Sequence, residues 1–245
     1  MKLTKKILFL TLALLCSATL ASAVPGRAEV MKVVGKATAT DAKGSAKSIT
    51  QGMVLGTGDT ITTDPGSTVD LNLGLNGDFL RVDPDTSIKI DNLDIANVAN
   101  RTVTTQLNVN RGGITGNVVN KLSVASKYEI KSASGVAGIR GTVYSVKTDA
   151  SGRITRIICT SGTVRFTQGG VTVTITAGQA LTPPPVGTAL TQATVGAATA
   201  TEQSDVAGVG QTLGLNASQT TPALGTVINN PSDVSVAQPR IYAQD

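Results

Sequence analysis

The side chains that could do chemistry limit what this sequence can be. The chain contains no histidine, so it lacks the imidazole of a Ser-His-Asp or Cys-His group, a histidine zinc site or a proton shuttle. Pairs of carboxylates can hydrolyse glycosides, but no pair of acids here can be told from acids that cap turns. Aromatic residues make up only 2% of the chain, which argues against stacking platforms for bases or sugar rings. We therefore expect a protein that is not an enzyme and has no cofactor.

A cluster of acidic residues is the candidate for a metal site. Calcium takes six to eight oxygen ligands, and four aspartates could supply some of them. Their spacing fits no calcium loop, and acids are common in turns, so we expect no metal here and leave calcium as the alternative. The four aspartates are Asp78, Asp83, Asp85 and Asp91.

Arg140 lies between Gly138-Ile139 and Gly141-Thr142, where strands should pack closely. Its guanidinium has five donors, so it could tie together turn carbonyls or a carboxylate of a neighbouring strand. The structural tie is the interpretation we favour, and ligand binding by Arg140 is the alternative. The glycine spacing follows no strand–helix phosphate pattern, which argues against a nucleotide loop.

The first 23 residues predict a secretory signal peptide. Three lysines precede an apolar run over residues 7–20, and Ala21-Ser22-Ala23 supplies the small residues of a cleavage site. The run is shorter than the roughly 20 residues that cross a bilayer, so we expect cleavage after Ala23 and no remaining membrane span. The chain from residue 24 onward keeps 18 basic and 16 acidic residues, a net charge of +2. No basic run remains, so we expect no nucleic-acid partner.

Cys159 is the one cysteine of the expected mature chain, because Cys16 lies in the signal peptide. A single cysteine cannot form an internal disulfide. We expect Cys159 to be a small apolar side chain packed in a strand, with an intermolecular disulfide as the alternative.

Alternating apolar and polar residues dominate the chain from about residue 27 to residue 181. In residues 69–75 and 171–175 every second residue is Val, Leu or Ile, which places the apolar side chains on one face of a strand. Turn residues separate such runs, and Asn76-Gly77 is the best hairpin signal. We find no helical pattern outside the signal peptide. The sequence predicts an all-β domain over residues 24–182, with short antiparallel strands in two packed sheets, as a sandwich or a solenoid-like stack.

Residues 183–245 form a low-complexity tail rich in Pro, Ala and Thr. Three prolines at 183–185 block strand pairing. Few large apolar side chains follow, so burial cannot offset the entropy of ordering, and we expect a mostly irregular tail. The alternative is that the apolar spots at 206–215, 224–228 and 241–242 dock on the domain or on a neighbour, as a strand or short helix.

Several blocks, in order, resemble the FecR domain from about residue 30 to residue 180. The first block has Gly52, Leu55, Gly58, Asp59, Ile61 and Thr63, followed by Ser67, Val69, Leu71 and Leu73. Later blocks are Asn76 to Leu80 with Ser87, Gly138 to Thr142 with Tyr144 and Val146, Ser161 to Val164, and Ala177 to Gln179. The motif residues, to which we assign structural roles, are Gly58, Asp59, Ser67, Arg140, Gly141, Thr142 and Gly178.

The resemblance implies an extracytoplasmic, β-rich domain of bacteria. In the best-known members it follows a cytoplasmic anti-sigma segment and a transmembrane helix, and it relays a signal from an iron-transport receptor. Only six residues precede the apolar run here, so we do not expect the relay function. We expect an exported binding or scaffold module, in the periplasm or at the cell surface, that recognises an envelope protein or glycan through a sheet edge or face. The alternatives are a structural envelope component that assembles through its tail, and the sensor part of a sigma-factor regulatory system.

Overall fold

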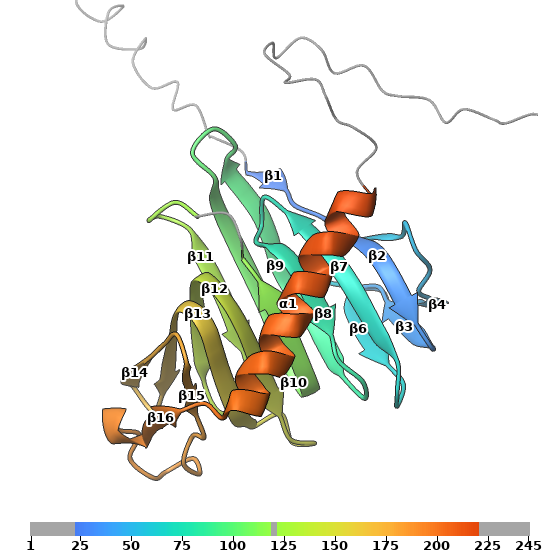
Figure 1. Ribbon diagram of the computed structural model, residues 1–245. Helices are drawn as coiled ribbons and strands as arrows, with labels where there is room; N and C mark the ends of the chain where they lie inside the picture. The colour runs from blue at the N-terminus through green and yellow to red at the C-terminus, as the bar shows by residue number, and fades with distance from the viewer. Residues whose placement is uncertain (1–22, 119–121, 221–245) are drawn as a thin grey trace, which may run out of the picture.

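The computed structural model of the protein describes residues 23–118 and 122–220, so nearly all of the expected signal peptide lies outside the described residues. Strands make up most of the described chain (Figure 1). They are β1 (Val24–Pro25), β2 (Ala28–Val34), β3 (Ala37–Thr40), β4 (Ala46–Ser48), β5 (Val54–Leu55), β6 (Thr60–Thr63), β7 (Thr68–Gly74), β8 (Asp78–Val82), β9 (Ser87–Asn97), β10 (Thr102–Asn117), β11 (Lys127–Lys131), β12 (Val136–Thr148), β13 (Ile154–Gln168), β14 (Val171–Thr176), β15 (Gln179–Leu181) and β16 (Val195–Ala197). A 3-10 helix covers Gln192–Thr194, and the helix α1 covers Ala200–Thr220.

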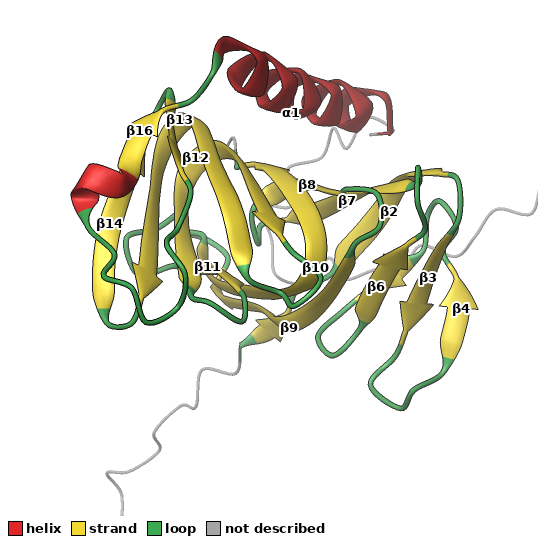
Figure 2. Cartoon of the chain, turned by 90° about the horizontal axis from the view of Figure 1, so that it is seen from below, coloured by secondary structure: helices red, strands yellow, loops and turns green. Residues whose placement is uncertain are grey.

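The prediction of an all-β fold is confirmed, and hydrogen bonds connect the strands in one 16-stranded sheet rather than in two separate ones. Its main path runs β16-β15-β13-β12-β11-β10-β8-β7-β2-β5, and β9 joins β10 to β6 and β1. The pairs are antiparallel, except that β10 and β11 run parallel. The sheet is strongly curved, and its concave face surrounds the core (Figure 2). One continuous sheet therefore takes the place of the two packed sheets that the sequence predicts.

The long strand β10 lies where the sheet bends. Its first half pairs with β9 and β11, and its second half pairs with β8 and β12. The change of partners falls at Gly112, which has a φ of +87° and lies so close to Thr86 that a side chain at 112 would collide with it. Glycine adopts this conformation without strain. Gly112 therefore permits the bend.

The predicted alternation of apolar residues builds the core. Leu71 and Leu73 of β7 and Val173 and Ile175 of β14 are each at most 1% exposed. They belong to one hydrophobic cluster that includes residues from β2 through β15. Each such side chain stabilises the fold by roughly 1.5–3 kcal/mol before conformational entropy is subtracted. The largest fully buried side chain is Tyr144 on β12.

The predicted hairpin at Asn76-Gly77 is present, since β7 and β8 pair on either side of it. Asn76 is fully buried, which the hairpin alone does not require. Its Nδ2 donates to the carbonyls of Asp94 and Thr104, at 3.1 and 3.2 Å, and to Thr105 Oγ1 at 3.2 Å. The turn is thus bonded to both β9 and β10.

The helix α1 lies across the outer, convex face of the sheet, against β8, β10, β12 and β13 (Figures 1 and 2). Thr199 and Glu202 cap its first turn, since Thr199 Oγ1 accepts from the Glu202 N–H at 3.2 Å and Glu202 Oε2 accepts from the Thr199 N–H at 2.9 Å. The Arg156 guanidinium on β13 donates to both Glu202 oxygens, at 2.8 and 2.9 Å. Two apolar side chains of the helix itself, Val206 and Leu213, are buried.

The sequence pattern did not predict α1, and over residues 206–214 the structure shows the docked alternative for the tail. The apolar spots at 224–228 and 241–242 lie outside the described residues. None of the helices within residues 23–118 and 122–220 has the length and hydropathy that crossing a membrane demands.

Candidate binding groove

The motif residues near the N-terminus stabilise turns. Gly58 has a φ of +98°, and Asp59 Oδ2 accepts a hydrogen bond from the Gly56 N–H at 2.8 Å. Ser67 Oγ accepts one from the Lys36 N–H at 2.9 Å. These contacts are all made within the fold.

The later motif residues also shape the backbone. Gly141 has a φ of +57° and lies in the bulge at which β12 changes its register with β13. Thr142 is 1% exposed. Gly178 has a φ of +78° and donates its N–H to the Cys159 carbonyl at 2.8 Å. Arg140 differs from these residues because its side chain is exposed.

Arg140 borders a groove of about 220 Å³ on the outer face of β11, β12 and β13. Gly138 lines the groove and is paired with Glu129 of β11 on one side and with Arg165 of β13 on the other. Because Gly138 carries no side chain, the row between Glu129 and Arg165 is open. The groove is therefore a depression in a sheet face, and Ser123 and Ser126 also line it.

Positive charge predominates in this groove. It contains three cationic side chains, Lys127, Arg140 and Arg165, and one acidic side chain, Glu129. Glu129 is already bonded, to Lys127 Nζ at 3.1 Å and to Gln106 Nε2 at 2.9 Å. Neither the Arg140 side chain nor the Arg165 side chain forms a hydrogen bond or ion pair with any residue that the structure describes. Two exposed guanidinium groups thus face one open depression.

The structure does not show the structural tie that we expected of Arg140. No carboxylate or turn carbonyl among the described residues accepts a hydrogen bond from its guanidinium. The exposed position on a cavity wall favours the alternative interpretation, in which Arg140 binds a ligand. Arg165 was missed from the sequence, because nothing in an alternating strand shows that one polar residue borders a groove.

Guanidinium groups suit oxyanions. Each presents paired N–H donors that match a carboxylate, a phosphate or a sulfate. The buried walls of the groove include Leu122, Tyr128 and Ile139. The Tyr128 and Tyr144 hydroxyls lie 3.0 Å apart, and burial raises the pKa of both, so they remain protonated. The groove thus offers anion recognition on an apolar base.

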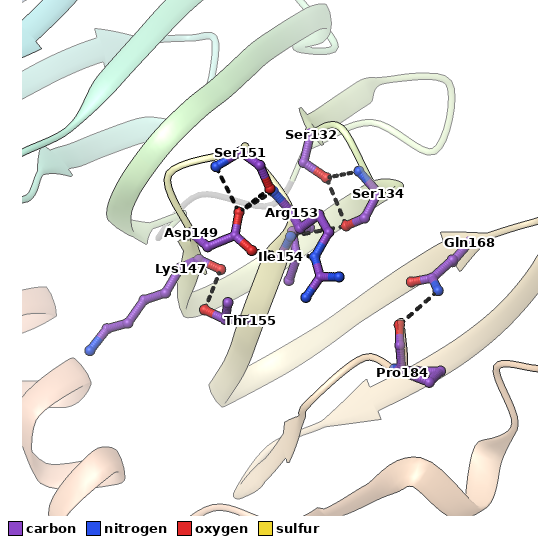
Figure 3. Close-up of polar contacts among 10 residues, drawn as sticks. All are labelled: Ser132, Ser134, Lys147, Asp149, Ser151, Arg153, Ile154, Thr155, Gln168 and Pro184. Carbon is purple, nitrogen blue, oxygen red and sulfur yellow. Dashed lines mark hydrogen bonds and ion pairs between the residues drawn. The ribbon is translucent and has the colours of Figure 1, made fainter. Parts of the chain in front are cut away.

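A second, more open cavity, of about 450 Å³, lies on the same outer face beside Asp83 and Lys147. Both side chains converge over Gly113, where a Cβ would be 2.9 Å from Asp83 Oδ2 and 3.5 Å from Lys147 Cγ. Burial raises the pKa of Asp83 to about 6, against the opposing attraction of Lys147 and Arg81. Figure 3 shows Lys147 beside Thr155, whose hydroxyl donates to the Lys147 carbonyl at 3.3 Å.

The four aspartates considered for calcium do not come together. Asp78, Asp85 and Asp91 each lie within 3.7 Å of a different cation, respectively Arg101, Arg111 and Lys131. Asp83 lies in the second cavity. Within the described ranges, no three carboxylate or thiol groups are placed to hold a metal ion.

Cys159 is buried in β13, as expected of an apolar residue in a strand. Its thiol donates to the Ser161 carbonyl at 3.2 Å. Burial raises the pKa of this thiol to about 11, so it is protonated and shielded from oxidation at neutral pH.

Comparison with known proteins gives one family match. Residues 59–165 match the family described as FecR protein, a range that contains Asp59, Ser67, Arg140, Gly141 and Thr142 but neither Gly58 nor Gly178. No curated protein matches the chain. Two crystal structures of a candidate anti-sigma factor from Parabacteroides distasonis resemble it at 10% identity, with TM-scores of 0.40 and 0.41. Each alignment covers 51% of this chain and 54% of the other, so the chain spans about half the length of these structures.

Proposed function

We propose, from the match of residues 59–165 to the FecR family, that this chain is an exported, non-enzymatic binding module. Its groove at Arg140 and Arg165 recognises an acidic group on a protein or glycan of the bacterial envelope. The expected signal peptide supports export. The absence of histidine from the whole sequence supports binding over catalysis, because it removes the commonest acid–base group.

One observation carries the proposal: two exposed arginines, Arg140 and Arg165, line the same cavity without a carboxylate partner among the described residues. In a structural role, an arginine on a sheet face would pair with an acid of the next strand. Here the one acid in the groove, Glu129, is bonded to Lys127 and Gln106 instead. The donors of both guanidinium groups therefore remain available to a ligand.

The test compares capture of an envelope component by immobilised variants of the full chain. We expect Arg140→Ala/Arg165→Ala to lose most of the retention, while Arg27→Ala, which removes an exposed arginine elsewhere, keeps it. Both variants should melt within about 0.5 kcal/mol of the wild-type free energy of unfolding, as exposed residues usually do. Equal capture by the double variant and the wild type would reject the proposal. Loss of stability in Arg140→Ala would instead restore the structural interpretation of Arg140.

The family match also favours a second function, the extracytoplasmic sensor part of a sigma-factor regulatory system. The two functions differ in what happens to the N-terminal segment. An exported module begins at Val24 after cleavage, whereas a membrane-bound sensor retains its apolar segment. N-terminal sequencing of the protein recovered from cells distinguishes them.

A further inference from the structure

The strand β14 has one edge that is not occupied by a strand in the described part of the chain. It pairs with β13 along its other edge, and Gly169 and Gly170 form the two-residue turn between them. In such a hairpin, Gln168 and Val171 bond to each other next to the turn. It follows that Thr172, Thr174 and Thr176 point their N–H and C=O groups away from β13.

The Gln192 side chain occupies this outward edge. Its Oε1 accepts from the Thr174 N–H at 2.9 Å, and its Nε2 donates to the Thr174 carbonyl at 2.7 Å. A carboxamide carries the same donor and acceptor as a peptide group, so Gln192 makes the two bonds that a residue of a neighbouring strand would make. Gln179 Oε1 likewise accepts from the Thr176 N–H at 2.9 Å. Figure 2 shows the 3-10 helix that contains Gln192 next to β14.

The composition of β14 explains why its edge needs this cover. Its sequence is Val-Thr-Val-Thr-Ile-Thr, six β-branched residues without a charge or a proline. Proteins usually protect an exposed edge with lysine, proline or a bulge, and uncharged β-branched segments are the ones that pair with other chains. None of those devices lies within β14. The side chains of Gln192 and Gln179 provide the protection instead.

The strand is also complementary to itself. If two copies paired antiparallel about a twofold axis at Thr174, Thr174 would face its own copy and Thr172 would face Thr176. Threonine pairs across strands are favourable, and no like charges would meet. A second copy of this chain is therefore the partner that the edge fits best.

We propose that Gln192 closes the edge of β14 and so prevents it from pairing with β14 of a second copy of this chain. Removing the carboxamide frees both hydrogen-bonding groups of Thr174. An exposed edge of this composition then associates with its own copy.

The test is the mass of the full chain in solution, measured by light scattering during gel filtration at rising protein concentration. We expect Gln192→Ala to shift toward twice the wild-type mass as the concentration rises. Gln211→Ala, which makes the same change on the exposed face of α1, should match the wild type. Adding Thr174→Lys to Gln192→Ala should restore the wild-type mass, because two ammonium groups would then lie opposite each other in the pair.

Hydrogen exchange of the Thr174 amide shows whether Gln192→Ala exposes the edge of β14. In Gln192→Ala the Thr174 amide should exchange faster at low protein concentration, on the order of tenfold, and should regain protection as the chains associate. An unchanged mass for Gln192→Ala at every concentration, with a normal melting curve, would overturn the proposal. So would a mass shift that Thr174→Lys fails to reverse, because the association would then use another surface.

Discussion

Asp83 should make the protein less stable at neutral pH than at mildly acidic pH. Its carboxylate lies in the second cavity, and burial raises its pKa from 3.8 to about 6, while Lys147 and Arg81 attract the charged form and Asp70 repels it. The folded protein therefore binds a proton on Asp83 more tightly than the unfolded chain does. Stability contributed by this group is fully present below pH 3.8 and is lost as the pH rises through about 6.

The magnitude follows from the difference between the two pKa values. At about 1.36 kcal/mol per pH unit, it corresponds to at most about 3 kcal/mol at pH 7. Asp83→Asn removes the charge and keeps the shape, so we expect the variant to unfold with a free energy higher by up to about 3 kcal/mol at pH 7. As the pH falls toward 4 the difference should shrink toward zero, because Asp83 of the folded wild type is then protonated.

The assay is urea unfolding of both proteins at several pH values between 4 and 8. Asp85→Asn is the matched control, because the Asp85 side chain is 70% exposed and asparagine tolerates its φ of +52°. We expect this control to stay within about 0.5 kcal/mol of the wild type. A stability difference for Asp83→Asn that does not change with pH would refute the reasoning. A less stable variant at pH 7 would show that the attraction of Lys147 outweighs the cost of burial.

Three further changes test the described contacts. Glu202→Ala removes the helix cap and the bond to Arg156, so α1 should become sensitive to limited proteolysis under conditions where the wild type resists. Those bonds lower the pKa of Glu202 to about 2. The wild-type contact should therefore persist until the pH falls toward that value. Tyr128→Phe leaves the buried Tyr144 hydroxyl without its partner and should cost about 1–3 kcal/mol in urea unfolding, whereas Tyr128→Phe/Tyr144→Phe should cost less than the sum of the single changes. Gly116→Ala places a methyl group against the Tyr144 ring and should lower the free energy of unfolding by about 1–3 kcal/mol.

The strands could be predicted because their signal is local. A residue such as Leu71 faces the core in any sheet whose strand alternates as β7 does, and the dipeptide Asn76-Gly77 is a turn signal that can be read without knowing the rest of the fold. The continuity of the sheet could not be predicted in this way. It depends on the bend of β10 at Gly112 and on which strands meet on either side of that bend.

The helix α1 lacks such a signal. Val206 and Leu213 are its buried apolar side chains among those that the structure describes, which is too few to give a helical period. Its position depends on tertiary contacts, such as those of Glu202 with Arg156 and of Asn117 Nδ2 with the Gly210 carbonyl at 2.9 Å.

The candidate groove was half predicted. The sequence singled out Arg140 as one residue of a motif, but it did not show that Gly138 opens the face beside it. Nor did it show that Arg165 pairs in register with that glycine. Adjacency across strands decides the site, and one strand read alone does not contain that information.

The buried amide of Asn76 also bears on the order in which the chain can assemble. Its three acceptors lie 18 to 29 residues further along the chain. A nascent chain that ends before residue 104 can form the β7–β8 hairpin, but the acceptors of the Asn76 amide at Thr104 and Thr105 are not yet present. The N-terminal half of the domain therefore cannot make all of its native hydrogen bonds during synthesis until β10 has been added.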